Sequence, residues 1–320
     1  MIKTKLEQKP DKDWNNRLLS SGIGNHNQTM ERGIHFERHG QIPFYLKFID
    51  ENEKIVGQLL FAKSSRFDNK GKKGSILKKI PILKQNTYFW IYGPIIFEPT
   101  LSSKIYEKLE KFLESEKCKV FGSTYPQPTN NISTITNKFE LEKWGTYIIN
   151  LEKPKEDIYK NIEKHSGRKN IERSERKGVT VEEINDKSLF EYCKLRGEKS
   201  IPIEEQYKQD LKWWKLSNPL GISGFLAKWK GNVVGGLIFY YFNNMIIEGG
   251  VARSEIDKKN NLYSQDLIKW KIIEWGIKNN MKGYDLSGFN PNPKIKKEEG
   301  IKRYKAKWGG EEFSYWFIKK

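Results

Sequence analysis

Gly283-Tyr-Asp-Leu-Ser-Gly288, Phe289-Asn-Pro-Asn-Pro293 and Gly300-Ile-Lys-Arg-Tyr-Lys-Ala-Lys-Trp-Gly-Gly310 form the stretch around which the sequence is organised. The first part predicts a short strand with Asp285 near its end, followed by a loop rich in Gly, Asn and Pro. The last part predicts a short basic helix that two glycines stop, before a closing aromatic strand. A carboxylate at the end of a strand, close to a basic helix, indicates a binding site there.

Working outward, the same order of elements is predicted twice: a hairpin, a third strand, a helix and a fourth strand. In the first half these are residues 44–62, 88–92, 101–118 and 120–124; in the second half they are 224–241, 244–251, 262–279 and 284–288. Val234-Gly235 occupies the place that Val56-Gly57 has in the first hairpin. We infer a tandem duplication of a β-β-β-α-β unit, which makes the fold class α/β with mixed sheets. The alternative is a chance similarity between two mixed α/β halves.

The length and the charge of the chain restrict its class. A chain of 320 residues fits two domains better than one small core. The 58 Lys and Arg residues against 40 Asp and Glu residues leave a net charge of +18. Such a surface attracts polyanions such as RNA, nucleotide-linked substrates or an acidic membrane surface. General lysine-rich composition is the alternative explanation for part of this charge.

Several classes of protein are not indicated. Cys118 and Cys193 have no second Cys or His at metal-ligand spacing, so neither a disulfide framework nor a zinc site is expected. The N-terminal residues lack the apolar core of a signal peptide, and the longest apolar run, 233–242, is about half of the ~20 residues that a membrane span needs. We therefore expect a cytoplasmic protein that uses no metal and no cofactor.

A basic segment lies between the two repeats. Residues 154–177 are predicted to form one helix, with Pro154 at its start and Gly178 as its stop. Few acidic residues lie four positions away from its cations, which favours a polyanion-binding face over an ordinary solvated one. The cations are Lys160, Lys164, His165, Arg168, Lys169, Arg173, Arg176 and Lys177.

The predicted strand-end site suggests acyl transfer. Asp285 and Lys305 could orient an amine nucleophile and stabilise an oxyanion. Neither Cys lies beside a plausible His, and no Gly-x-Ser-x-Gly elbow occurs, so direct attack by the amine is the simpler mechanism. The alternative is that Asp285 caps the next segment and that Lys305 is one lysine among many.

The closing stretch, Tyr284 to Gly288 and then Gly300 to Gly309, resembles the closing motif of the Fem family of peptidyltransferases. These enzymes move an amino acid from aminoacyl-tRNA onto the peptide of a cell-wall precursor. Residues 144–151 with Arg168-Lys-Asn-Ile171 are similar to the family's domain junction, and Tyr92-Gly93-Pro94 is similar to its first-domain cleft strand.

The resemblance implies two GNAT-like acyltransferase domains, residues 1–145 on the acceptor side and 146–320 as the catalytic, donor side. It also implies roles for single residues. Lys305 with Tyr304 would stabilise the reacting carbonyl or the tRNA end, and Tyr92 would line the acceptor cleft. In the mechanism that we expect for the site, Asp285 or Glu248 helps to deprotonate the acceptor amine. The predicted substrate-binding residues are Tyr92, Glu98, Tyr207 and Tyr304, and the predicted tRNA-binding residues are Lys164, Arg168, Lys169, Arg173 and Arg176.

The sequence also departs from the family pattern. Ile203 precedes Tyr207 where a phosphate-binding Arg is expected, and Glu98 comes one place later than the expected acidic residue, which leaves the acceptor open. The segment 203–217 is too short for the long helical hairpin of some members, so an arm-less form is expected. Residues 258–261 read Lys-Lys-Asn-Asn and lack the loop that holds the pyrophosphate of coenzyme A in ordinary GNAT enzymes.

Three hypotheses on function follow. The first is an aminoacyltransferase that moves an amino acid from aminoacyl-tRNA to an amine of a peptide-bearing cell-envelope precursor, with peripheral contact to an acidic membrane surface. The second is an N-acyltransferase that uses acyl-CoA or an acyl carrier. The third is a non-catalytic RNA-binding protein with a GNAT-like shell.

Overall fold

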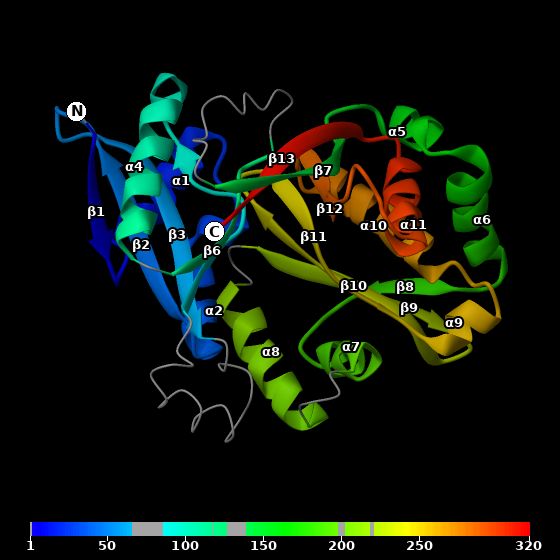
Figure 1. The fold of residues 1–320 in the computed structure, drawn as a ribbon. Coiled ribbons are helices and arrows are strands. Elements are labelled where there is room, and N and C mark those ends of the chain that lie inside the picture. The colour runs from blue at the N-terminus through cyan, green and yellow to red at the C-terminus, as the bar shows by residue number, and fades with distance from the viewer. Residues whose placement is uncertain (1, 66–85, 117, 127–138, 198–201, 218–220) are drawn as a thin grey trace. The chain divides into compact units, whose positions relative to one another are not determined.

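The structure is a computed structural model and describes residues 2–65, 86–116, 118–126, 139–197, 202–217 and 221–320 (Figure 1). Its contacts divide the chain into two compact units. The first consists of Met1–Gly145 with Phe313–Lys320, and the second consists of Thr146–Glu312. The closing strand therefore joins the first unit, although the chain reaches it last.

The first unit is a mixed sheet with the strand order β1-β2-β3-β4-β6-β13, and the short β5 pairs with β3. Its neighbours along the chain pair antiparallel, whereas β4 and β6, which α4 separates, pair parallel. The strands are β1 (Lys3–Glu7), β2 (Ile42–Ile49), β3 (Ile55–Ser65), β4 (Asn86–Trp90), β5 (Ile95–Ile96), β6 (Lys119–Ser123) and β13 (Glu311–Lys319). The α-helices are α1 (Trp14–Ser21), α2 (Met30–Arg38) and α4 (Ser102–Ser115).

The second unit is a mixed sheet with the strand order β7-β12-β11-β10-β9-β8. Its strands are β7 (Glu140–Asn150), β8 (Thr180–Glu183), β9 (Ile222–Trp229), β10 (Asn232–Phe242), β11 (Met245–Arg253) and β12 (Gly283–Phe289). Its helices are α5 (Lys155–Asn161), a π-helical turn (Lys164–Arg168), α6 (Lys169–Arg176), α7 (Ser188–Arg196), α8 (Ile203–Ser217), α9 (Glu255–Lys259), α10 (Ser264–Lys278) and α11 (Lys296–Ala306).

Helices cover both faces of the second sheet. Side chains alternate along a strand, so Phe225 and Phe239 pack into one core with α10, whereas Leu226 and Ile238 pack into another with α7 and α8. Both faces are buried, which explains why the central strands are apolar at nearly every position. Residues placed at the ends of these strands therefore lie between two packed layers.

The two units share the predicted β-β-β-α-β plan. In the first, β2, β3 and β4 form an antiparallel series, and β6 follows α4 parallel to β4. In the second, β9, β10 and β11 form the same series, and β12 follows α10 parallel to β11. The predicted α/β fold class, with a repeated unit, is confirmed.

One predicted helix was wrong. Residues 154–177 do not form a single helix, because the backbone of Ile162 and Glu163 is extended between α5 and the π-helical turn. The Glu163 side chain accepts from the backbone amides of His165 and Ser166, and its own amide donates to Lys307 O at 2.7 Å. These bonds replace those that a continuous helix would make, so the basic residues lie on a turn and a short helix.

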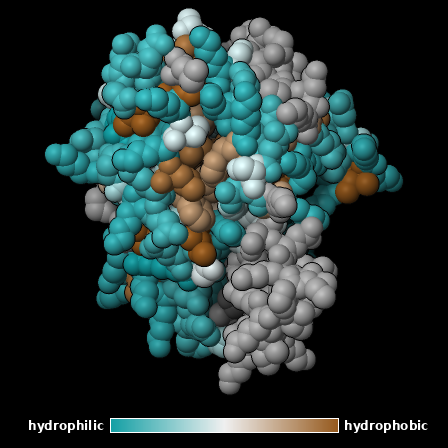
Figure 2. Space-filling view, turned by 60° about the vertical axis from the view of Figure 1, so that its left-hand side comes forward, coloured by the Kyte–Doolittle hydropathy of each residue, from teal (hydrophilic) through white to brown (hydrophobic). Residues whose placement is uncertain are grey.

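The surface in Figure 2 is mostly hydrophilic, with hydrophobic side chains gathered near its middle. In the part of the chain that the structure describes, no helix is both long enough and apolar enough to cross a membrane.

Candidate active site

The strands β11 and β12 of the second unit separate part of the way along their length. Their parallel pairing covers only Met245–Ile247 with Gly283–Asp285. Beyond this point the register of β11 with β10 also shifts, between Leu237 and Phe239. Glu248 on β11 and the end of β12 therefore lie where the sheet opens, and charged side chains from two helices come to the same place.

Lys305 of α11 is held at the end of β12. Its ammonium group donates to Ser287 O at 2.9 Å and to Gly288 O at 2.8 Å. An ammonium group has three N–H donors, so one remains without a partner among the described residues. Burial lowers the pKa of Lys305, while the nearby carboxylate of Glu248 acts in the opposite direction. The ammonium group therefore has the capacity for one further hydrogen bond.

Asp285 shapes the turn that receives Lys305. Its Oδ1 accepts from the amide of Ser287 at 2.7 Å, and the Thr146 hydroxyl lies within hydrogen-bond distance of both this oxygen and Ser287 O. Ser287 has a φ of +64°, which is uncommon for a residue other than glycine. The geometry therefore supports Asp285 as a residue that positions the carbonyl groups around Lys305.

Glu248 is bound from two sides. It forms an ion pair with Lys269 of α10, and the Tyr284 hydroxyl donates to its Oε2 at 3.1 Å. The side chains of Lys269 and Glu248 are only 2% and 9% exposed. Burial raises the pKa of Tyr284 far above its ordinary value, which keeps this hydroxyl a donor. Glu248 is therefore a fixed hydrogen-bond acceptor at the opening of the sheet.

Tyr304 lies between two buried ammonium groups. Lys307 Nζ is 4.1 Å from the centre of its ring and Lys269 Nζ is 5.6 Å from it, and such contacts are favourable when water is excluded. Lys307 forms an ion pair with Asp266 of α10. Burial and the nearby Asp266 carboxylate raise the pKa of Tyr304 well above its ordinary value. The tyrosine thus links the Lys269–Glu248 pair to the Lys307–Asp266 pair.

Four of the predicted site residues come together in this unit: Lys305, Asp285, Glu248 and Tyr304. Sequence reasoning missed Thr146, Lys269, Asp266 and Lys307, which complete the cluster. One signal could have found two of them, because Asp266 and Lys269 are charged residues three apart in a helix whose other positions around them are buried. Buried charges of this kind are rare unless they are paired.

The remaining predicted substrate-binding residues lie elsewhere. Tyr207 is on α8, and its hydroxyl donates to Asp186 O at 3.0 Å. Tyr92 and Glu98 belong to the first unit. Tyr92 is buried, with a φ of +51° and a carbonyl that accepts from Asn25, whereas Glu98 is exposed and pairs with Lys54 at 2.6 Å. The contacts described for these three residues are with the protein itself, so their role in substrate binding stays a prediction.

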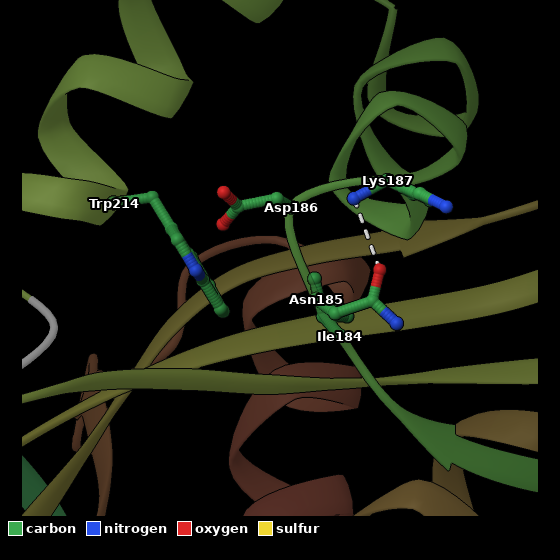
Figure 3. Close-up of a pocket in the computed structure, with 5 residues that line it drawn as sticks. All are labelled: Ile184, Asn185, Asp186, Lys187 and Trp214. Atoms are coloured by element: carbon green, nitrogen blue, oxygen red, sulfur yellow. Dashed lines mark hydrogen bonds between the residues drawn. The ribbon is translucent and has the colours of Figure 1, made fainter.

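A cavity of about 520 Å³ lies beside Tyr207. Figure 3 shows its lining, in which the Lys187 amide donates to Asn185 Oδ1 at 3.0 Å and the ring of Trp214 faces the cavity. Asp186 pairs with Lys215 at 3.2 Å. The cavity contains no residue of the Lys305 cluster, so we do not place the reaction there.

The predicted tRNA-binding residues Lys164, Arg168, Lys169, Arg173 and Arg176 lie on the π-helical turn and α6; we call residues 163–176 the basic segment. Arg168 donates to Ile162 O at 3.1 Å, and Arg173 donates to Asn170 Oδ1 at 3.2 Å. Within the described ranges none of the five forms an ion pair with a carboxylate. Their charge is therefore open to a polyanion.

The residues before α10 do not fit coenzyme A. The amide of Ser264, at the start of α10, donates to Asp257 Oδ1 at 2.9 Å. Asp257 is fully buried and pairs with Arg253. Asp266 lies in the first turn of α10. A pyrophosphate needs free amides and positive potential at such a helix start, whereas carboxylates lie at the start of α10.

Among the residues that the structure describes, no group of three or more His, Cys, Asp or Glu side chains could hold a metal ion.

No protein-family model matches this chain, and a search of curated proteins finds no match. Solved structures do resemble it. The crystal structure of FemX has a TM-score of 0.66 at 10% identity and covers 98% of this chain and 97% of its own. The C-terminal domain of a putative lysylphosphatidylglycerol synthetase from Agrobacterium fabrum has a TM-score of 0.56 at 9% identity, covering 95% and 92%. A tandem GNAT protein from the clavulanic acid biosynthesis pathway has a TM-score of 0.54 at 8% identity, covering 100% and 98%. The chain therefore has the Fem-like tandem GNAT fold.

Proposed function

We propose that this chain is an aminoacyltransferase that moves an amino acid from aminoacyl-tRNA to an amine of a peptide in a cell-envelope precursor. The observation that carries the proposal is Lys305, a partly buried ammonium group that donates to two carbonyl oxygens and has no third hydrogen-bond partner among the described residues. The likeness to FemX and to lysylphosphatidylglycerol synthetase supports an acyltransferase of this kind.

In the proposed reaction, the acceptor amine attacks the carbonyl carbon of the aminoacyl ester. A C–N bond forms, and the third N–H of Lys305 donates to the oxyanion that develops. The ester C–O bond then breaks, and the leaving ribose oxygen of the tRNA takes up the proton that the amine has given to Glu248, so the tRNA leaves with a free hydroxyl group. Glu248 accepts the proton that the amine loses, while Lys269 and Tyr284 hold its carboxylate in place. No covalent enzyme intermediate is required.

The choice of donor follows from charge. The basic segment presents five cations that form no ion pair with a carboxylate of the described residues, which suits the phosphates of an RNA. Asp257 and Asp266 surround the helix start at which the pyrophosphate of coenzyme A would have to bind. Acyl-CoA is therefore the weaker alternative, because acidic residues lie at the start of α10.

The test is transfer of a labelled amino acid from charged tRNA to a lysine-containing peptide. We expect Lys305→Ala to lower the rate constant by on the order of 10²–10³, the loss typical of one oxyanion donor. Lys297→Ala is the matched control, because Lys297 is an exposed lysine on the same helix. Turnover of Lys305→Ala near that of the unmodified chain would refute the assignment.

The same assay separates the alternatives. Transfer from acyl-CoA but not from charged tRNA would favour the coenzyme A hypothesis. Tight RNA binding without transfer, and without any effect of Lys305→Ala, would favour the non-catalytic RNA-binding protein. Transfer to phosphatidylglycerol in vesicles but not to the peptide would keep the donor and change the acceptor.

A further inference from the structure

Contacts of Lys307 join the end of α11 to the basic segment. Lys307, which follows the last residue of α11, forms an ion pair with Asp266 and donates to Ser166 O at 2.9 Å. Its own carbonyl oxygen accepts from the Glu163 amide at 2.7 Å. One residue thus contacts α10 through its side chain and the π-helical turn through both its side chain and its backbone.

The packing around these contacts is close. The side chains of Lys307 and Asp266 are 7% and 6% exposed. Asn170 donates to Ser166 O at 2.6 Å and lies 3.3 Å from Asp266 Oδ2. Gly309 has a φ of +70°, and a Cβ atom there would come within 2.5 Å of Asn161 O. The backbone after α11 therefore fits closely against Asn161 at the end of α5, two residues before the basic segment begins.

We propose that Lys307 is a positioning residue that joins the basic segment and α11 into one rigid piece. A donor RNA bound on the basic segment would then be presented to Lys305 in a fixed register, two residues from the Lys307 anchor. The presentation of a donor RNA to Lys305 rests on the proposed function, whereas the connection between α11 and the basic segment does not. A displacement of about 1 Å at a reacting centre can cost on the order of 100-fold in rate.

The first arm of the test needs no substrate. Lysine side chains of the full chain are labelled with an N-hydroxysuccinimide ester, and the labelling of Lys305 is followed by mass spectrometry. We expect slow labelling in the unmodified chain, because Lys305 is partly buried and its ammonium group donates to two carbonyl groups. Lys307→Met should raise this labelling several-fold, whereas Lys297→Met should not. Unchanged labelling in Lys307→Met would overturn the proposal.

The second arm measures transfer and RNA affinity separately. Lys307→Met should lower the transfer rate constant on the order of 10- to 100-fold and leave RNA affinity unchanged, since Lys307 is buried. Equal losses in both quantities would mean that Lys307 is only part of the RNA-binding charge, which would contradict the positioning role.

The double variant Asp266→Asn with Lys307→Met separates position from stability. A single buried charge without its partner destabilises the fold, whereas removal of both charges restores much of the melting temperature. We expect the double variant to regain stability and to remain slow in transfer. A recovery of rate together with stability would show a merely structural pair. If the unmodified chain neither binds RNA nor transfers, the proposed function fails, and the labelling arm still decides the role of Lys307.

Discussion

Lys305 is the residue on which the proposed chemistry depends, and its environment makes that chemistry pH-dependent. The group must be protonated to donate to an oxyanion. Burial lowers the pKa of Lys305 from an ordinary value near 10.5. The transfer rate should therefore fall as pH rises through this lowered pKa, before an exposed lysine would lose its proton.

The same shift predicts an opposite change in stability. Between the lowered pKa of Lys305 in the folded state and the ordinary pKa in the unfolded state, the unfolded chain binds more protons. The free energy of unfolding then rises with pH in this window. Burial also lowers the pKa of Lys307, which adds to the same trend. Comparison of urea unfolding for the unmodified chain and for Lys305→Met across this range checks the prediction. Equal pH slopes for the two proteins would contradict it.

At the scale of elements, the basic segment should bind RNA in a salt-dependent way. Each phosphate contact contributes roughly 0.7 to 0.9 to the slope of log affinity against log salt. Arg168→Ala or Lys169→Ala should each weaken binding and reduce the slope by about 1. Lys104→Ala, which changes an exposed lysine of α4 in the first unit, should alter neither quantity. An RNA affinity that changes neither with the salt concentration nor with these substitutions would remove RNA as the donor.

Two glycines, one inside the helix α11 and one three residues after its end, have opposite expectations. Gly300 lies inside the helix, and a Cβ atom there meets nothing within 4 Å, so Gly300→Ala should stabilise the fold by up to about 1 kcal/mol. Gly309 has a positive φ, and a Cβ atom would collide with the backbone of Asn161. Gly309→Ala should therefore destabilise the fold by roughly 1–3 kcal/mol. Thermal unfolding of the two variants provides the comparison, and equal melting temperatures would refute it.

The elements that could be predicted are those whose pattern is local. The hairpin of β9 and β10 and the strand β12 followed from apolar runs between turn residues, because strand formation depends on neighbours in sequence. The break at Ile162 and Glu163 could not be predicted, because it depends on a residue far away in the chain. The carbonyl oxygen of Lys307 accepts the hydrogen bond from the Glu163 amide.

The site was predictable to a similar extent. The sequence predicted Asp285 at a strand end and Lys305 on a basic helix, and the structure places them on β12 and α11; their roles remain predictions. Lys269 was not, because its role depends on Glu248, which only the sheet brings beside it. Buried pairs between separate elements leave no local pattern apart from the unusual presence of a charge on an apolar helix.

At the scale of the whole molecule, the last strand is distant along the chain from the unit that it completes. Phe317, Ile318 and Lys319 of β13 pair antiparallel with Ser123, Gly122 and Phe121 of β6, and Ile318 is buried in the core of the first unit. The stability of that unit therefore depends on residues that follow the whole second unit in the sequence.

A truncation after Glu312 tests this dependence. Without residues 313–320, β6 loses a neighbouring strand, and the core loses the buried side chains of Tyr315 and Ile318. We expect the amides of β4 and β6 to exchange faster by at least tenfold, since each buried side chain of this size contributes about 1.5–3 kcal/mol. The amides of β10 and β11 in the second unit should keep their protection, because the pairing between those two strands involves no truncated residue. Hydrogen exchange read by mass spectrometry distinguishes the two units. Equal loss of protection in both would mean that they unfold as one cooperative body, and that completion of the first sheet by β13 is not a local event.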